Sequence, residues 1–132
     1  MIYVWIALGS AIGGAGRYWC NNLLSGALGN AFPWGTIAVN VAGSFLIGFL
    51  VSSDPFSGRS WLPGLEARAF LIVGVCGGYT TFSAFSLQTL DLLRTGQWPQ
   101  ALGNIALSVA LCLLAVWLGH LAYVVLGTSR AG

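Results

Sequence analysis

Residues 74–81 read GVCGGYTT and lie in the middle of an apolar segment that runs from residue 67 to residue 92. A straight helix over that segment would be about 39 Å long at 1.5 Å per residue, which exceeds the hydrocarbon core of about 30 Å in a typical membrane. Two adjacent glycines followed by two β-branched threonines are poor helix formers. We therefore expect a transmembrane helix that is broken near its middle.

A break at this depth has chemical consequences. Interrupted backbone leaves N–H and C=O groups without helical partners, and such groups persist in a membrane only where they are buried in protein, line water or coordinate an ion. The alternative is a glycine kink that serves only the packing of helices. The eight residues alone are compatible with both interpretations.

The rest of the chain is also apolar. Of its 132 residues, 57% are hydrophobic and 6% are charged, against roughly 25% charged in an ordinary soluble domain. Three further stretches qualify as membrane spans, and turn-rich segments separate them. The sequence thus predicts an all-α integral membrane protein of one domain over residues 1–132, with four transmembrane helices at 2–24, 36–51, 67–92 and 100–126.

Glycines recur at helical spacing in two of these predicted helices. Gly9 and Gly13 share one helix face, as do Gly74 and Gly78. Small residues four positions apart let two membrane helices approach closely. We expect these faces to mark helix–helix contacts.

Basic residues are spread almost evenly between the two sides of the membrane. With both termini on one side, that side holds Arg59, Arg68 and Arg130, and the other holds Arg17 and Arg94. So small an excess hardly orients a chain under the positive-inside rule. Because four helices of this size also enclose no wide pore, we expect an antiparallel dual-topology homodimer, in which two copies insert in opposite directions.

Several function classes are disfavoured by what the predicted spans lack. No run of Lys and Arg suggests a nucleic-acid partner. Asp54, Glu66 and Asp91 lie in the central loop or at the end of a span, whereas proton-coupled transporters and cation pores usually carry an acid at mid-depth. His120 is the only histidine and has no acidic partner in register. We do not expect an enzyme.

Uncharged polar residues form stripes along the predicted spans. Thr36, Asn40 and Ser44 recur every four residues in the second span, and Asn104 and Ser108 do so in the fourth. Such stripes are more often links between helices, worth about 0.6 kcal/mol per hydrogen bond, than the lining of a pore. Asn, Ser and Thr donors can also replace the hydration shell of a small anion.

Two phenylalanines and two serines follow the predicted break: Phe82, Ser83, Phe85 and Ser86. Phe82 and Phe85 share a helix face because they are three residues apart. The edge of an aromatic ring carries the positive part of its quadrupole and can face an anion. Such a pair ordinarily packs in a core or against lipid, but together with the polar stripes it favours a path for a small anion.

Three blocks of sequence resemble the Fluc-type fluoride channels, a family of small membrane proteins that export fluoride. Residues 13–18 (GGAGRY) resemble the glycine-rich end of the family's first helix, and residues 33–45 (PWGTIAVNVAGSF) resemble its P-x-G-T-x-x-x-N-x-x-G-S-F block. Residues 77–86 (GGYTTFSAFS) are similar to its G-G-x-T-T-F-S-T-F-S signature. The resemblance covers nearly the whole chain, and the third block is very specific.

The resemblance implies an assembly as well as a fold. It implies an antiparallel dual-topology homodimer with two pores, each lined by both subunits. It also implies a structural Na⁺ at the dimer centre, held by the backbone carbonyls of Gly77 and Thr80. Exposed carbonyls at a break suit a hard cation that prefers oxygen ligands, and a site on a two-fold axis receives the same groups from both chains.

By position, the resemblance also gives the candidate site residues their roles. Asn40 would hydrogen-bond fluoride, and Phe82 and Phe85 would border the path. Arg17 would stand in an aqueous vestibule and attract anions. Three serines would be candidates for the polar track: Ser83, Ser86 and Ser108.

Three positions depart from the family pattern. Ala84 stands where the family usually has threonine, and Gln88 stands where it often has an acid. Cys112 occupies a position that is often small or hydroxylated. We expect these departures to affect the rate and the fine selectivity, and not the class of protein.

The function that these features favour is passive export of fluoride by a multi-pass protein of the bacterial plasma membrane, the inner membrane, which gives fluoride resistance. Hydrogen fluoride crosses membranes as a neutral weak acid and ionises at cytoplasmic pH, so a channel lets the negative-inside potential drive the anion out. The expected partners are fluoride, lipid and a second copy of the chain. A small multidrug-type proton-coupled transporter and a non-transporting membrane assembly protein are the alternatives.

Overall fold

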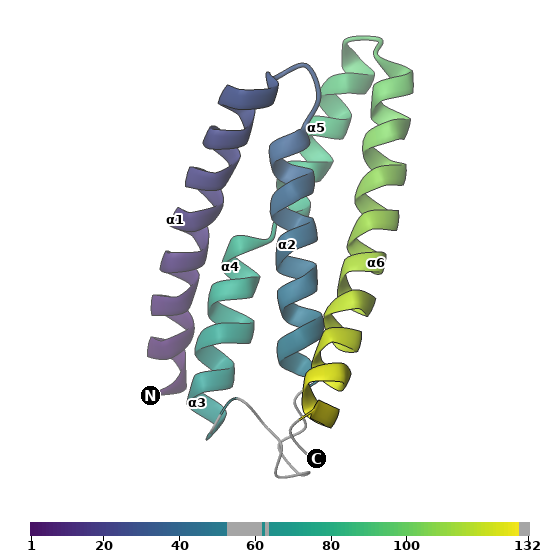
Figure 1. Ribbon diagram of the computed structural model, residues 1–132. Coiled ribbons are helices and arrows are strands. Elements are labelled where there is room, and N and C mark those ends of the chain that lie inside the picture. The colour runs from purple at the N-terminus through teal and green to yellow at the C-terminus, as the bar shows by residue number, and fades with distance from the viewer. Residues whose placement is uncertain (53–61, 63, 130–132) are drawn as a thin grey trace.

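The computed structural model describes residues 1–52, 62 and 64–129, and these residues form an all-helical bundle (Figure 1). Its elements are α1 (Ile2–Leu28), α2 (Trp34–Val51), α3 (Gly64–Arg68), η1 (Ala69–Cys76), α4 (Gly77–Tyr79), α5 (Phe82–Arg94) and α6 (Trp98–Ser129). The elements from α3 to α5 follow one another directly and make up the third helix. Helices thus cover all four stretches that the sequence predicts, and several of them extend a few residues further.

The third helix is interrupted at the predicted place. Thr80 and Thr81 have extended backbone between α4 and α5, with φ/ψ of −79°/155° and −152°/112°. Figure 1 shows the chain stepping sideways between these two elements, about half-way along the bundle. The prediction of a third helix that is broken near its middle is confirmed.

The residues before the break form a π-helix, which the sequence does not predict. This segment, η1, consists of apolar and small residues from Ala69 to Cys76. Its hydrogen bonds close over five residues rather than four, which changes the direction in which the following residues face. Such turns are rare and are often found next to functional sites.

Three helices in the described part of the chain are long and apolar enough to cross a membrane: Trp34–Val51, Gly64–Arg94 and Trp98–Gly127. α1 has 27 residues, but its second half carries Arg17, Asn21 and Asn22, which lower its mean hydropathy. In Figure 1 α1 runs beside α2 and beside the half of the third helix that precedes the break. Composition therefore supports three of the four predicted crossings.

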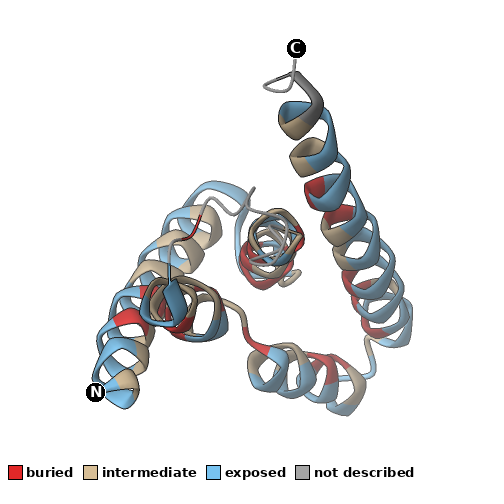
Figure 2. Cartoon of the chain, turned by 90° about the horizontal axis from the view of Figure 1, so that it is seen from below, coloured by how far each residue is buried: buried red, intermediate tan, exposed pale blue. Residues whose placement is uncertain are grey.

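The bundle has a small core and an apolar outside. Buried residues face the interior, whereas exposed residues cover the outer faces of the helices (Figure 2). Val39 is 1% exposed, but the large side chains of Tyr3, Trp19 and Leu113 are 82%, 67% and 65% exposed. A soluble monomer rarely exposes apolar surface on this scale, so the outer surface suits lipid.

Glycines make the closest helix contacts, as their spacing predicts. A methyl group on Gly13 of α1 would collide with the carbonyl oxygen of Val75, and one on Gly78 would collide with that of Ser10. Gly48 makes the same kind of contact between α2 and α6. The absence of side chains at these positions lets the backbones touch.

Four of the five charged residues of the described part lie toward the ends of the third helix, and the fifth, Arg17, belongs to α1. Glu66 and Arg68 belong to α3, near the end of the bundle that holds the N-terminus, and Asp91 and Arg94 lie in the last turn of α5 at the opposite end (Figure 1). Three charged residues named in the sequence analysis lie outside the described residues: Asp54, Arg59 and Arg130.

Candidate functional site

A side chain of α2 holds the break in the third helix. Asn40 accepts a hydrogen bond from the backbone N–H of Thr81 through Oδ1 at 2.7 Å, and its Nδ2 donates to the carbonyl of the same threonine at 3.0 Å. The two residues are 41 positions apart in the chain. This reciprocal pair gives partners to both backbone groups of a residue that has left the helical ladder.

Thr81 also caps the start of α5. Its Oγ1 accepts a hydrogen bond from the N–H of Ala84 at 3.1 Å, which is the arrangement that makes Ser and Thr favourable before a helix. Ser83 Oγ lies 3.2 Å from the same oxygen. The helix therefore begins inside the bundle, where its macrodipole places partial positive charge.

Carbonyls of the last turn before the break lose their helical donors, and for two of them the donor has another partner. In a continuous helix the N–H of Thr81 would bond to Gly77, and the N–H of Ala84 would bond to Thr80. Here these N–H groups bond to Asn40 Oδ1 and Thr81 Oγ1 instead. Gly77 is exposed on the surface of the bundle, and Thr80 is half-buried.

A groove of about 470 Å³ opens beside the break, between α2, α5 and α6. Its lining comes from these helices and the break itself: Asn40, Ser44, Ile47, Thr80, Thr81, Phe82, Phe85, Ser108, Val109, Cys112, Leu113 and Val116. We call this space the phenylalanine groove. It places polar groups of the break next to aromatic and aliphatic walls.

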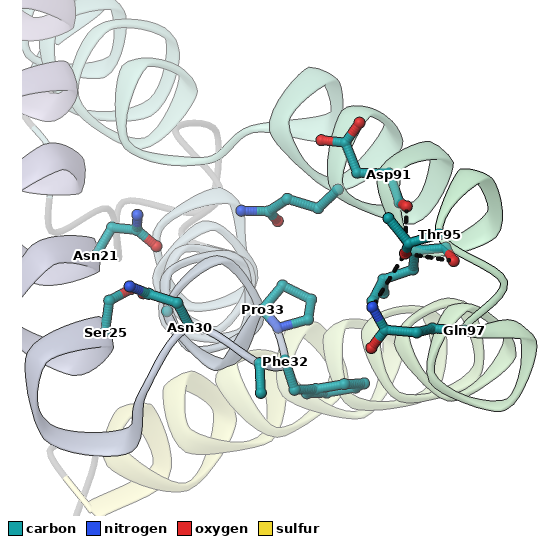
Figure 3. Close-up of a pocket in the computed structure, with 12 residues that line it drawn as sticks. Asn21, Ser25, Asn30, Phe32, Pro33, Asp91, Thr95 and Gln97 are labelled. Carbon is teal, nitrogen blue, oxygen red and sulfur yellow. Dashed lines mark hydrogen bonds between the residues drawn. The ribbon is translucent and has the colours of Figure 1, made fainter.

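A polar vestibule lies between α1, α2 and α5. It consists of two adjoining cavities of about 390 and 550 Å³, both of which are lined by Asn21 and Gln88. The smaller, inner cavity also contains Arg17 and Thr81 in its lining. The larger, outer cavity lies near the connection between α5 and α6, where Figure 3 shows Asn21 and Asp91 on opposite sides of the space.

The vestibule and the phenylalanine groove meet at the break, because Thr81 lines both. The Asn40–Thr81 pair therefore stands between a polar cavity that contains Arg17 and a groove with aromatic walls. Gln88 Oε1 is buried beside the inner cavity and has no hydrogen-bond partner within the described residues. Uncharged donors, one arginine and ring edges can together guide a small anion past the break.

The sequence pattern of the family described as "CrcB-like protein, Camphor Resistance (CrcB)" matches residues 4–120. The chain belongs to this family. The fluoride-specific ion channel FluC of Methylocella silvestris is 55% identical to it over 130 residues, which cover 98% of each chain. The proteins of the same name from Rhodospirillum rubrum and Opitutus terrae are 49% identical over 126 residues and 52% identical over 129 residues.

The alignments with these relatives span nearly the whole of both proteins. They cover 96% of this chain and 97% of the Rhodospirillum rubrum protein, and 98% of this chain and 97% of the Opitutus terrae protein. The CrcB-like chain is thus a multi-pass membrane protein related over its full length to ion channels.

Five of the predicted pathway residues of the CrcB-like chain lie around the break. The phenylalanine groove brings together four of them: Asn40, Phe82, Phe85 and Ser108. The fifth, Arg17, lines the inner vestibule. The departures from the family pattern lie on the same surfaces, with Ala84 and Gln88 in the vestibule and Cys112 in the groove.

Two predicted residues, Ser83 and Ser86, line neither the groove nor the vestibule. Both are exposed on α5. Ser86 Oγ donates to the carbonyl of Phe82 at 2.9 Å, and Ser83 Oγ shares a hydrogen bond with Thr81.

The polar stripe of α6 serves mainly as a link between helices, which is the alternative that the sequence left open. Asn104 is 1% exposed, and its Nδ2 donates to Thr89 Oγ1 at 2.8 Å. Thr89 Oγ1 donates in turn to the carbonyl of Phe85 at 2.8 Å. Ser108 lines the groove and donates to Asn104 Oδ1 at 3.3 Å.

Sequence reasoning missed Thr81 and Asn21. Thr81 carries a detectable signal, because a threonine directly before the first helical residue is a common N-cap. Asn21 carries none: it matters because its Oδ1 lies against Gly35 at the start of α2, where a methyl group would collide with it. That contact depends on how two separate helices pack.

Proposed function

We propose that the chain is a fluoride-selective channel that lets fluoride leave the cytoplasm passively across the bacterial plasma membrane. The observation that carries the proposal is its identity at about half of all positions, over nearly the full length, with proteins named fluoride-specific ion channels. It is an ion channel and not an enzyme. Because the chain belongs to this family, the channel is favoured over the two alternative functions, a proton-coupled transporter and a membrane assembly protein.

Passive fluoride export needs a driving force, but it does not need a carboxylate that couples transport to protons. A negative-inside potential supplies about 2.3 kcal/mol per elementary charge for each 100 mV. In the part of the chain that the structure describes, the carboxylates Glu66 and Asp91 lie near the ends of the bundle. A path for an anion past the break therefore meets none of these negative charges at mid-depth.

The pathway we propose runs from the vestibule, past the break, into the phenylalanine groove. Arg17 attracts the anion into the vestibule. The N-terminus of α5 adds partial positive charge at the break, and Asn40 and Ser108 contribute amide and hydroxyl groups beside Phe82 and Phe85. Hydrogen bonds along a narrow path suit a small, strongly hydrated anion better than chloride.

The exposed residues on either side of the break support a dimer. Gly77 is exposed, and its carbonyl no longer accepts the N–H of Thr81, which bonds to Asn40 instead. Phe82, the first residue of α5, is 78% exposed. Broken backbone does not face lipid, because unpaired polar groups in hydrocarbon cost several kcal/mol each. We propose that a second copy in the opposite orientation covers the break, in an antiparallel dual-topology homodimer with α1 as the fourth crossing.

Such a dimer would complete two equivalent pathways. The partner would supply the missing wall of each phenylalanine groove, so that both subunits line each of two pores. Ser83 and Ser86, which are exposed on α5 in the single chain, would then face the partner and complete the polar track.

A structural Na⁺ fits the chemistry of the break. The carbonyls of Gly77 and Thr80 are among the groups at the break whose helical donors bond elsewhere, and Na⁺ is a hard cation that prefers oxygen ligands. On a two-fold axis both chains would offer the same carbonyls. When bound, the ion would neutralise these oxygens at the dimer centre.

Growth of a fluoride-sensitive bacterium tests the proposed function. In cells that lack fluoride export, expression of this protein should raise the fluoride concentration that still permits growth, compared with an empty vector. Equal sensitivity of both strains, with the protein present in the membrane, would reject the proposal.

A further inference from the structure

The orientation of the Asn40 side chain is determined by its partner. The N–H of Thr81 requires an oxygen, and the carbonyl of Thr81 requires an N–H, so only one orientation of the carboxamide satisfies both groups. The carboxamide has two N–H groups, of which one is engaged in this pair. At most one remains for an ion.

The pair also decides which carbonyls stay free. By accepting the N–H of Thr81, Asn40 keeps it away from the carbonyl of Gly77, its partner in a continuous helix. The extended Thr81 then places its own Oγ1 where it accepts the N–H of Ala84, which would otherwise bond to Thr80. One side chain on α2 thus accounts for the redirection of both N–H groups away from these carbonyls.

We propose that Asn40 is a positioning residue for ion conduction, which holds Thr81 in the extended conformation and so keeps the third helix open at the break. Its effect on fluoride passes through the backbone of Thr81, which lines both the vestibule and the phenylalanine groove. Without it, the N–H of Thr81 returns toward the carbonyl of Gly77, and the route past the break closes. This inference rests on the proposed channel function, because it assigns a cause to conduction.

The test measures the backbone of Thr81 and the flux separately. Protein labelled with ¹³C-threonine is examined by NMR in lipid nanodiscs, with the Thr81 Cβ signal assigned through Thr81→Ser. The chemical shift of this carbon distinguishes extended from helical backbone. Fluoride efflux from liposomes is measured for the same proteins.

Three variants separate a positioning role from direct contact with fluoride. Asn40→Ala removes both hydrogen bonds, and Asn40→Asp keeps an oxygen for the N–H of Thr81 in either protonation state. Asn22→Ala is the matched control, since Asn22 is exposed on α1 and lines neither the vestibule nor the phenylalanine groove.

We expect Asn40→Ala to lose the extended signal of Thr81 together with most of its fluoride flux, whereas Asn22→Ala keeps both. Asn40→Asp should keep the extended signal, and if Asn40→Ala does not fold, Asn40→Leu, which fills the same space without an oxygen or an N–H, should lose the signal in its place. An unchanged Thr81 signal in Asn40→Ala, or its loss in Asn40→Asp, would overturn the proposal. If the wild-type protein passes no fluoride, the channel function fails, but the NMR comparison still decides whether Asn40 holds the break.

Discussion

The rings of Phe82 and Phe85 lie with their centroids 5.2 Å apart and their planes tilted by 45°. Both rings line the phenylalanine groove, in which Asn40 and Ser108 also take part. The two rings come from successive turns of α5, directly after the break. The edge of an aromatic ring can attract an anion in such a groove, which an aliphatic side chain of similar size cannot do.

Replacing Phe82 by isoleucine should therefore reduce fluoride flux. If the edge interaction is of the size found for aromatic pairs, about 0.5–1.5 kcal/mol, its loss corresponds to a decrease of roughly two- to tenfold. The measurement is fluoride efflux from liposomes, with size-exclusion chromatography to show that assembly is unchanged. Phe45→Ile is the control, because Phe45 is exposed on α2 outside the groove. Equal flux in Phe82→Ile and wild type would argue against the aromatic role.

Replacing Gly13 by alanine should destabilise the bundle. The added methyl group would collide with the carbonyl oxygen of Val75, and overpacking of this kind costs about 1–3 kcal/mol. Thermal unfolding in detergent measures the change. Gly26→Ala in the same helix meets no atom within 4 Å and should be neutral, or more stable by up to about 1 kcal/mol. Similar melting temperatures for both variants would show that the α1 contact is not close.

The buried pair of Asn104 and Thr89 should show energetic coupling in a double-mutant cycle. Asn104→Ala and Thr89→Val each remove one partner of the hydrogen bond between α5 and α6. The coupling energy should be about 0.6 kcal/mol, and at most about 1.7 kcal/mol. Asn104→Ala combined with Asn22→Ala provides the comparison, because α1 and α6 do not touch. The free energies of these two changes should simply add; zero coupling for the Thr89 pair would contradict the structure.

Sodium should stabilise the protein if it occupies the proposed site. An ion that binds only the folded state adds RT ln(1 + [Na⁺]/Kd), which is about 2.7 kcal/mol at 100 times the Kd. The melting temperature should therefore rise with NaCl and stay constant in choline chloride of equal ionic strength. The same melting temperature in both salts would contradict a stabilising Na⁺ site.

Much of the fold can be predicted from local sequence, and the differences between prediction and structure also have local causes. The apolar stretches and the Gly/Pro-rich connections between them are enough to predict four helices. α1 continues to Leu28 because the residues after Leu24 contain no backbone that requires a turn until Gly29, whose φ of 81° ends the helix and whose N–H bonds to Ser25. Composition alone gives no signal for the π-helix of η1.

The break shows where sequence reasoning reaches its limit. Gly77 and Gly78 predict a weak point correctly, but both are helical, and the extended residues are Thr80 and Thr81. Thr81 is held by Asn40, which lies 41 residues earlier. A contact between distant residues leaves no mark in local propensity, so the conformation of the threonines could not be derived from the segment itself.

Only some of the residues that the motif singles out lie together in the structure. Asn40, Phe82 and Phe85 lie in one groove because the break directs the start of α5 toward α2 and α6. Ser83 and Ser86 follow the same motif but are exposed in the single chain. Their role depends on a partner surface, which one sequence does not describe.

Fluoride conduction can be measured directly with the purified protein in liposomes loaded with fluoride or chloride. A potassium ionophore provides the balancing charge movement. We expect rapid fluoride loss that depends on the ionophore, with little chloride loss from matched vesicles. Failure to release fluoride, or release of both anions at similar rates, would contradict a fluoride-selective channel.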